Sequence, residues 1–159
     1  MRATTRWLDA EEMAAWRAYI ETVIDLTAAL EADLAAHGLT LGDYQVLVVL
    51  SEAEGHERRM CDLAAKLQLS PSGLTRRLDG LVRGGLVARR PSETDRRVML
   101  AVLTEAGWEH LERVAPFHVE SVRRHVFDHL DGRDVNALGR IFTAIRGGLR
   151  ADAPACTDQ

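Results

Sequence analysis

The chain has 159 residues, of which 47% are hydrophobic and 28% are charged. This length and composition are typical of one domain that buries a core, and they exclude a disordered chain. The apolar runs, such as residues 46–50, are far shorter than the roughly 20 residues that span a bilayer. The N-terminus has acidic residues and no apolar signal-peptide core, so we expect a soluble, cytoplasmic protein with no membrane partner.

The cysteines Cys61 and Cys156 lie far apart and belong to no recognisable motif. This usage argues against a disulfide framework and fits a reducing compartment. Zinc-finger spacing is absent as well.

The formal net charge of −4 is unevenly distributed along the chain. Residues 1–55 carry a net charge of −7, residues 56–100 carry +5, and residues 101–159 carry −2. A basic middle segment between acidic ends indicates contact with a polyanion such as DNA, because the local field steers the ligand. The same distribution also fits a solvated arginine-rich face.

Hydrophobic periodicity predicts a long amphipathic helix over residues 10–36. Gly38 is expected to end this helix. Thr40 with Asp43 resembles a capping box, which predicts a second helix that ends before Gly55. The apolar positions of the first helix are Met13, Trp16, Tyr19, Val23, Leu26, Leu30 and Leu34.

Two shorter helices are predicted in the basic middle segment. The first covers residues 60–67, with Cys61, Ala64, Ala65 and Leu67 facing inward. Ser70 followed by Pro71 is a start signal for the second, which ends at residues 84–85, a pair of glycines. Residues 56–60 are too short for a prediction.

A period of two follows the double glycine and predicts short strands over residues 86–90 and 98–103. The polar turn between them ends with Arg96 and Arg97. We therefore expect a two-stranded hairpin with a basic tip.

Two further helices are predicted near the C-terminus. Thr104 is expected to cap a long helix that reaches Leu130 and is kinked or split at Pro116. Asp131 with Asp134 resembles the cap of a last helix, and the tail from residue 151 is expected to be frayed.

The order of these elements is that of a winged helix-turn-helix, so we predict a mainly α fold with a small β-hairpin. Polar groups gather at the start of the second short helix, which faces base edges in this fold. They are Ser70, Ser72, Thr75, Arg76 and Arg77, and Gly73 is a further candidate DNA-binding position among them. Arginine can donate two hydrogen bonds to guanine, hydroxyls can contact base or phosphate, and helix N-terminal amides favour phosphate.

Arg96 and Arg97 at the hairpin turn are expected to enter the minor groove, where the negative potential is enhanced. The alternative for both arginine pairs is a salt-bridged surface position.

The sequence LQLSPSGLTRRLDGLVRGGLVARR (residues 67–90), followed by ETDRRVMLAVLTEAG (residues 93–107), resembles the winged-helix core of the MarR (multiple antibiotic resistance regulator) family. The resemblance places the recognition helix on residues 71–83 and the wing-tip arginine on Arg97, with Arg96 beside it and Asp95 shaping the turn. It implies a homodimeric transcriptional repressor that binds a pseudo-palindromic operator on double-stranded DNA and releases it when a small ligand binds.

Long apolar stripes have few partners within one chain, which also favours a two-fold dimer. We therefore expect an N-terminal dimerisation helix (1–37), a DNA-binding lobe (38–103), C-terminal dimerisation helices (104–150) and a flexible tail (151–159).

Several residues invite other interpretations. Trp16, Tyr19 and His37 are candidates for binding a small aromatic or phenolic effector, although aromatic residues at helical spacing are more often core or interface. Cys61 is either a redox-active thiol or, as we favour, a buried small apolar residue. His125 and His129 have helical i, i+4 spacing, but no further ligand completes a set, so no metal or other cofactor is expected.

The sequence contains no nucleophile elbow, Walker loop or dinucleotide fingerprint, so we do not expect an enzyme. The alternative to a DNA-binding regulator is a winged-helix module that binds protein. Such a module has no need of the four arginines in the recognition helix and the wing.

Overall fold

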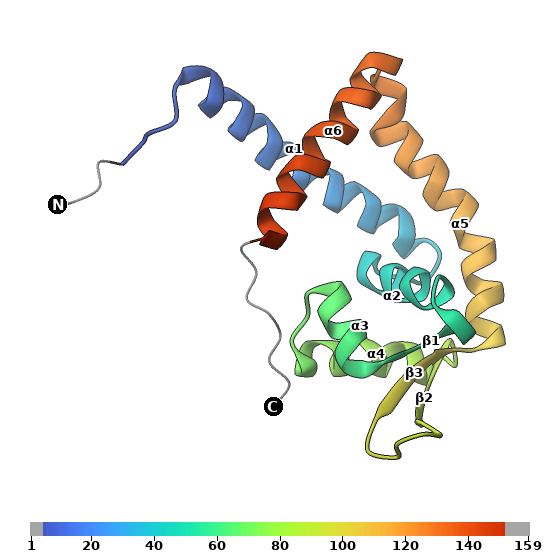
Figure 1. Cartoon of the computed structure of the whole chain (residues 1–159). Coiled ribbons are helices and arrows are strands. Elements are labelled where there is room, and N and C mark those ends of the chain that lie inside the picture. Colours follow the sequence, from blue (N-terminus) through green and yellow to red (C-terminus); the bar gives the residue numbers. More distant parts are fainter. Residues whose placement is uncertain (1–4, 152–159) are drawn as a thin grey trace. The chain divides into compact units, whose positions relative to one another are not determined.

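The computed structural model describes residues 5–151. The elements are α1 (Ala10–Ala35), α2 (Leu41–Ser51), the 3-10 helix η1 (Glu54–His56), β1 (Glu57–Arg59), α3 (Met60–Leu67), α4 (Pro71–Arg83), β2 (Val87–Pro91), β3 (Met99–Leu103), α5 (Glu105–His125), the 3-10 helix η2 (Phe127–His129) and α6 (Gly132–Ala151). Figure 1 shows the β2–β3 hairpin extending away from α2, α3 and α4. The predicted winged helix-turn-helix fold is confirmed. No helix within residues 5–151 has both the length and the apolar character needed to cross a membrane.

Hydrogen-bonded caps explain where the predicted helices begin. The Thr40 side chain accepts a hydrogen bond from the backbone N–H of Asp43, whose carboxylate accepts one from the N–H of Thr40. Ser70 caps α4 by accepting from the N–H of Gly73 at 3.1 Å. The corresponding caps of α5 and α6 use Thr104, and Asp131 with Asp134.

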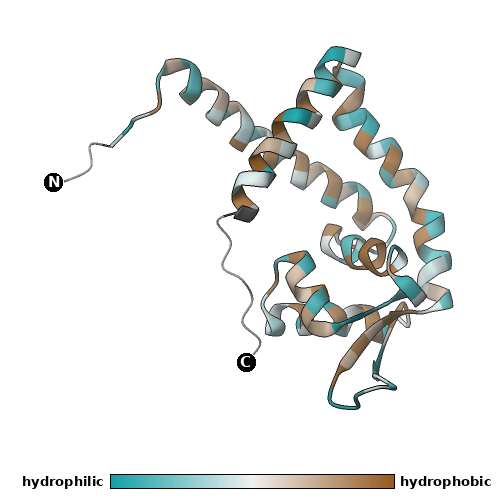
Figure 2. Cartoon of the chain, in the orientation of Figure 1, coloured by the Kyte–Doolittle hydropathy of each residue, from teal (hydrophilic) through white to brown (hydrophobic). Residues whose placement is uncertain are grey.

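The core lies where α2, α3 and α4 pack against the sheet. Leu47, Leu63 and Leu78 are completely buried there, and Ala101 of β3 is buried with them. Burying each leucine side chain contributes about 1.5–3 kcal/mol relative to leaving it exposed. This packing holds α4 against the hairpin. Figure 2 shows hydrophobic and hydrophilic residues alternating along the helices.

The sheet has three antiparallel strands in the order β1-β3-β2, where the sequence predicted a two-stranded hairpin. β2 pairs with β3 from Val87 opposite Leu103, and β1 joins the other edge of β3 with Glu57 opposite Val102. β1 has the sequence Glu-Arg-Arg, which lacks apolar alternation, so only backbone pairing identifies it as a strand.

The orientation of α3 differs from the prediction at Cys61 and Ala65, which are both exposed. Leu63 and Ala64 are buried instead. Cys61 precedes Leu63 by two residues and therefore projects about 200° away from it around the helix. Our interpretation of Cys61 as a buried apolar residue is wrong.

α5 runs through Pro116 without a break, so of the predicted kink or split the split is wrong. Proline removes only its own N–H from the helix, and the buried residues Leu111 and Val114 hold the preceding turns in place. The helix ends at His125, earlier than the predicted Leu130, and a 3-10 turn follows.

The chain forms two compact units, one reaching to Ser121 and the other starting at Val122. In the first unit, α1 buries Leu34 near its C-terminal end but exposes apolar side chains along its N-terminal half. In the second unit, α6 exposes Val135, Ile141, Phe142, Ile145 and Leu149. The predicted frayed tail, apart from Ala151 at the end of α6, lies outside the described residues, as does Cys156.

Candidate nucleic-acid interface

The recognition helix α4 is strongly amphipathic. Leu74, Leu78 and Leu81 are buried on its inner face. Its outer face exposes Ser72, Thr75 and Arg76, the last two residues lying one turn into the helix. The predicted outward direction of these three residues is therefore found in the structure.

The hydroxyl groups at the start of α4 differ in how they are used. The Ser70 hydroxyl is the helix cap and lies 3.2 Å from the Ser72 hydroxyl. The Thr75 hydroxyl donates to the backbone carbonyl of Pro71 at 2.9 Å. This bond leaves the Thr75 oxygen available as an acceptor, because a hydroxyl has two lone pairs.

The neighbouring arginines Arg76 and Arg77 have different surroundings. Arg76 is exposed. The Arg77 side chain is 33% exposed, and its Nη1 lies 3.3 Å from Thr40 Oγ1 and 3.7 Å from Asp43 Oδ1. The alternative of a salt-bridged surface arginine thus describes Arg77, which is bound to the first turn of α2.

A groove of about 520 Å³ lies beside this contact, between the start of α2 and the outer part of α4. Three arginines line it: Arg76, Arg77 and Arg83. Arg83 was not predicted as a site residue, because it lies at the C-terminal end of α4 and base contacts were expected only from the first two turns. Helical spacing from Arg76 is the signal that would have identified it.

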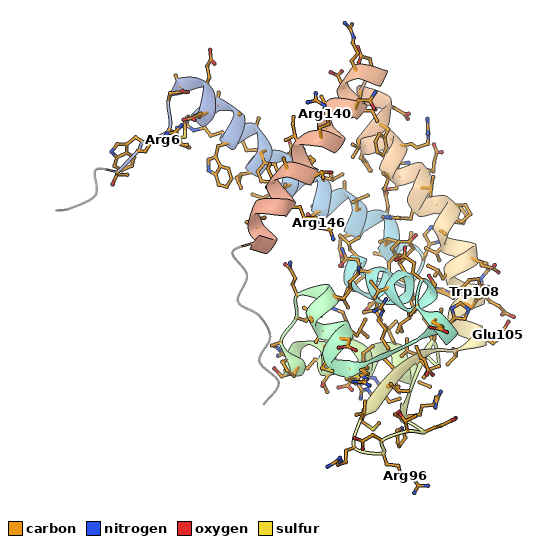
Figure 3. The ribbon with its side chains drawn as sticks, in the orientation of Figure 1. Arg6, Arg96, Glu105, Trp108, Arg140 and Arg146 are labelled. Atoms are coloured by element: carbon orange, nitrogen blue, oxygen red, sulfur yellow. The ribbon has the colours of Figure 1, made fainter. Side chains whose placement is uncertain are left out.

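The hairpin presents Arg96 and Arg97 at its tip. Figure 3 shows Arg96 at the far end of the hairpin, pointing away from the lobe. Arg97 is 91% exposed, and its Nε lies 3.2 Å from Asp95 Oδ1, so the salt-bridged surface alternative describes Arg97 as well as Arg77. Asp95 also accepts a hydrogen bond from the backbone N–H of Arg97 at 3.0 Å, and these two bonds lower the pKa of Asp95.

Two further arginines of the basic segment, on opposite faces of β2, are paired with groups of the protein. In β2, Arg89 is hydrogen-bonded to α4, and Arg90 pairs with Glu57 of β1 at 2.5 Å. No role was predicted for either arginine from the sequence. Successive strand residues point to opposite faces of a sheet, so two adjacent arginines in a predicted strand indicate that one of them lies on the face toward the core.

The effector candidates from the sequence do not meet in one place. Trp16 and Tyr19 are exposed neighbours on α1, with ring centroids 5.8 Å apart. His37 follows the other end of α1 and stacks on Phe117 at 4.5 Å. Eighteen residues separate Tyr19 from His37, which is about 27 Å along a helix, so one small molecule cannot touch both within one chain.

A different cavity, of about 500 Å³, lies between α1, α2, α3 and α5. Its walls include Leu30, Tyr44, Val48, Lys66 and His118. The rings of Tyr44 and His118 are 4.3 Å apart, and His118 Nδ1 is buried without a hydrogen-bond partner among residues 5–151. Burial lowers the pKa of His118 and raises that of Tyr44.

The histidine pair considered for metal binding is not on one helix face. α5 ends at His125, and His129 belongs to the 3-10 turn that follows. Helical i, i+4 spacing therefore does not apply to this pair. Within the described part of the chain, no group of three or more histidine, cysteine, aspartate or glutamate side chains is placed to hold a metal ion.

Comparisons with known proteins agree with this geometry. Residues 37–98 match the MarR family. The chain is 44% identical to AbsC, a MarR family transcriptional regulator from Streptomyces coelicolor, over 93% of this chain and 100% of AbsC, with a TM-score of 0.87. The chain belongs to the MarR family.

Two further relatives extend the comparison. Sco3205, a MarR family transcriptional regulator from Streptomyces coelicolor solved in complex with DNA, is 35% identical over 97% of this chain and 95% of that chain, with a TM-score of 0.88. The transcriptional repressor YetL of Bacillus subtilis is 28% identical and aligns with 85% of this chain and 83% of its own length. This MarR-family chain is a transcriptional regulator and not an enzyme.

Proposed function

We propose that this MarR-family protein binds double-stranded DNA as a homodimer and represses transcription at a pseudo-palindromic operator. One observation carries the proposal: the exposed polar face of α4 and the arginine-tipped wing belong to the same lobe and are joined by its core. The solved DNA complex of the relative Sco3205 supports it. Because DNA is its target, we place the protein in the cytoplasm.

In this proposal the major groove is contacted from the first two turns of α4. Arg76 is the principal base contact, because its guanidinium is exposed and can donate two parallel hydrogen bonds to guanine. Ser72 and Thr75 contact bases or phosphates through their hydroxyls. Ser70 and Gly73 form the helix start that lies nearest a phosphate.

The wing contacts the adjacent minor groove through Arg96 and Arg97. Asp95 keeps the Arg97 side chain aligned at the turn. Arg77 has a supporting role, since its guanidinium is bound to α2.

The homodimer is supported by apolar side chains that the single chain leaves exposed. On α1 the exposed fractions are 51% for Trp16, 42% for Tyr19 and 41% for Val23. Contiguous apolar surface of this kind marks a protein interface. We assign residues 1–37 and 104–150 to dimerisation and residues 38–103 to DNA binding.

We infer that the effector site is the cavity beside Tyr44 and His118, and not the exposed rings of Trp16 and Tyr19. The cavity volume suits a small aromatic or phenolic molecule. Lys66 supplies a positive charge for an acidic group, and the unpartnered Nδ1 of His118 supplies a polar contact. Such a ligand would contact both α3 of the lobe and α5, so it can alter the spacing of the recognition helices.

Selection of bound duplexes from random DNA tests this function. We expect one enriched, two-fold symmetric site, whose half-sites are about one helical turn or about 10 base pairs apart. The logarithm of the association constant should fall steeply with the logarithm of salt concentration, because several phosphates release counterions. No enrichment, or binding that is insensitive to salt, would refute the proposal.

Release assays on the selected duplex test the effector. Phenolic acids, oxidants and zinc are added separately to the preformed complex. The cavity proposal predicts release by a phenolic acid and loss of that response in Lys66→Ala. Release by an oxidant that disappears in Cys61→Ser would instead identify the exposed thiol as the sensor.

A further inference from the structure

Arg89 lies in β2 of the wing, yet its guanidinium is hydrogen-bonded to the recognition helix. Its Nη2 donates to the backbone carbonyl oxygen of Thr75 at 2.8 Å and to Asp79 Oδ1 at 2.9 Å. Only 27% of the side chain is exposed. One nitrogen atom therefore joins a wing strand to α4.

The sheet register explains why Arg89 makes this contact. Arg89 lies opposite Ala101 in β3 and two residues after Val87, and both of these residues are buried. Arg89 thus extends the face of the sheet that packs on the core, since residues two apart share a face. Arg90 lies on the other face and pairs with Glu57 of β1.

The two acceptors on α4 place the contact next to the DNA-reading surface. Thr75 and Asp79 are four residues apart and therefore lie on one side of the helix. Thr75 immediately precedes Arg76, the proposed base contact. A change in the position of the Arg89 guanidinium would therefore change the tilt of α4 where it meets the bases.

We propose that Arg89 is a positioning residue that fixes the angle between the recognition helix and the wing, so that both fit one operator half-site. This inference rests on the proposed DNA-binding function. Arg89 does not itself bind DNA, because Asp79 neutralises its charge and its Nε is buried. Asp79 acts through the same contact.

A competing account, in which Arg89 contacts a phosphate and Asp79 is only a surface acid, makes an opposite prediction. Removing an acid from a DNA-facing helix strengthens DNA binding when the acid merely repels phosphate. If Asp79 holds Arg89 in place, removing it weakens binding to the operator. The sign of the effect of Asp79→Ala therefore separates the two accounts.

The experiment compares Arg89→Ala, Asp79→Ala, their double variant and Arg89→Lys with the unmodified protein. Each is titrated with the selected operator and with a random duplex of equal length over a range of salt concentrations. Thermal unfolding and titration of the active fraction correct for any loss of folded protein. Arg83→Ala is the charge-matched comparison: it removes one positive charge from α4 without touching the Arg89 contact, so any loss of binding that it causes should be equal on both duplexes and should lower the salt slope.

We expect Arg89→Ala and Asp79→Ala each to weaken operator binding about tenfold, which is the effect of losing a charged hydrogen bond. Binding to the random duplex should stay within about twofold, and the salt dependence should not change, because no phosphate contact is lost. The double variant should bind no more weakly than Arg89→Ala, since both changes break one contact. Arg89→Lys should recover part of the affinity through one hydrogen bond to Asp79.

Three results would overturn the inference. One is operator binding by Arg89→Ala at the unmodified level. Another is an equal loss on both duplexes with a salt slope reduced by about 0.9, which identifies a phosphate contact. The third is stronger binding by Asp79→Ala. If Arg89→Ala does not fold, Asp79→Ala and Arg89→Lys decide the question. If the unmodified protein selects no duplex, the proposed function fails and this inference fails with it.

Discussion

The guanidinium of Arg77 occupies the space beside Gly42 that any larger residue would need. A Cβ atom at Gly42 would lie 1.9 Å from Nη1 of Arg77 and 2.2 Å from its Cζ. The same guanidinium reaches Thr40 and Asp43. Because Gly42 has no side chain, the Arg77 guanidinium of the recognition helix α4 can contact the first turn of α2.

Replacing Gly42 with alanine should displace Arg77 without unfolding the protein. Alanine favours a helix over glycine by up to about 1 kcal/mol. The displaced ion pair is partly exposed and contributes only about 0–1 kcal/mol. We expect urea unfolding to give a stability within about 1 kcal/mol of the unmodified protein, while operator affinity falls to the level of Arg77→Ala.

Gly139→Ala in α6 is the matched control for the unfolding measurement alone, because a Cβ there meets nothing within 4 Å in the single chain. Operator binding by Gly42→Ala at the unmodified level would show that the contact between Arg77 and α2 has no part in DNA binding.

Arg76→Ala should lower operator binding by about 1–3 kcal/mol, because a bidentate contact to guanine is lost. The loss on unrelated duplexes should be smaller. Competition titrations with operators altered one base pair at a time measure this, and discrimination at one base pair should disappear. An equal loss on every sequence would assign Arg76 to the phosphate backbone.

The stability of the protein should depend on the protonation of His118. Burial lowers the folded-state pKa of His118 below its ordinary value of 6.5, so the unfolded chain binds the proton more readily. The stabilising effect of a neutral His118 is therefore complete above about pH 6.5 and is lost as the pH falls through and below that value.

We expect His118→Gln to lose less stability than the unmodified protein between about pH 8 and about pH 5.5, as measured by urea unfolding. Tyr44→Phe keeps the ring that lies against His118 and should retain the unmodified pH response. An identical pH response in His118→Gln would contradict the assignment.

Trp16→Glu should convert the dimer into monomers. Trp16 is exposed in the N-terminal half of the apolar stripe of α1, and a carboxylate buried in an interface there has no partner. Sedimentation at several concentrations should give the mass of one chain, and operator binding should weaken. Ala18→Glu introduces the same charge about 200° around the helix and should leave the dimer intact. A dimer that survives Trp16→Glu would place the interface elsewhere.

Local signals in the sequence were sufficient for most of the helices and for the β2–β3 hairpin. Thr40 with Asp43, and Ser70 with Pro71, mark helix starts because each cap is formed within a few residues of chain. β1 was not predicted, because its strand character arises from pairing with β3, more than forty residues further along the chain.

The candidate DNA-binding surface also has features that the sequence predicts and features that only the tertiary structure shows. The sequence alone determined the basic segment, the polar face of α4 and the arginine-tipped wing, because these follow from spacing along the chain. Only the tertiary structure decided which arginines remain free for a ligand. Arg76 and Arg77 are neighbours in the sequence, but packing leaves Arg76 at the surface and binds Arg77 to α2. Packing also brings the Arg89 side chain, from a predicted strand, into a hydrogen bond with the recognition helix. Such partners come from distant segments, and no local pattern encodes them.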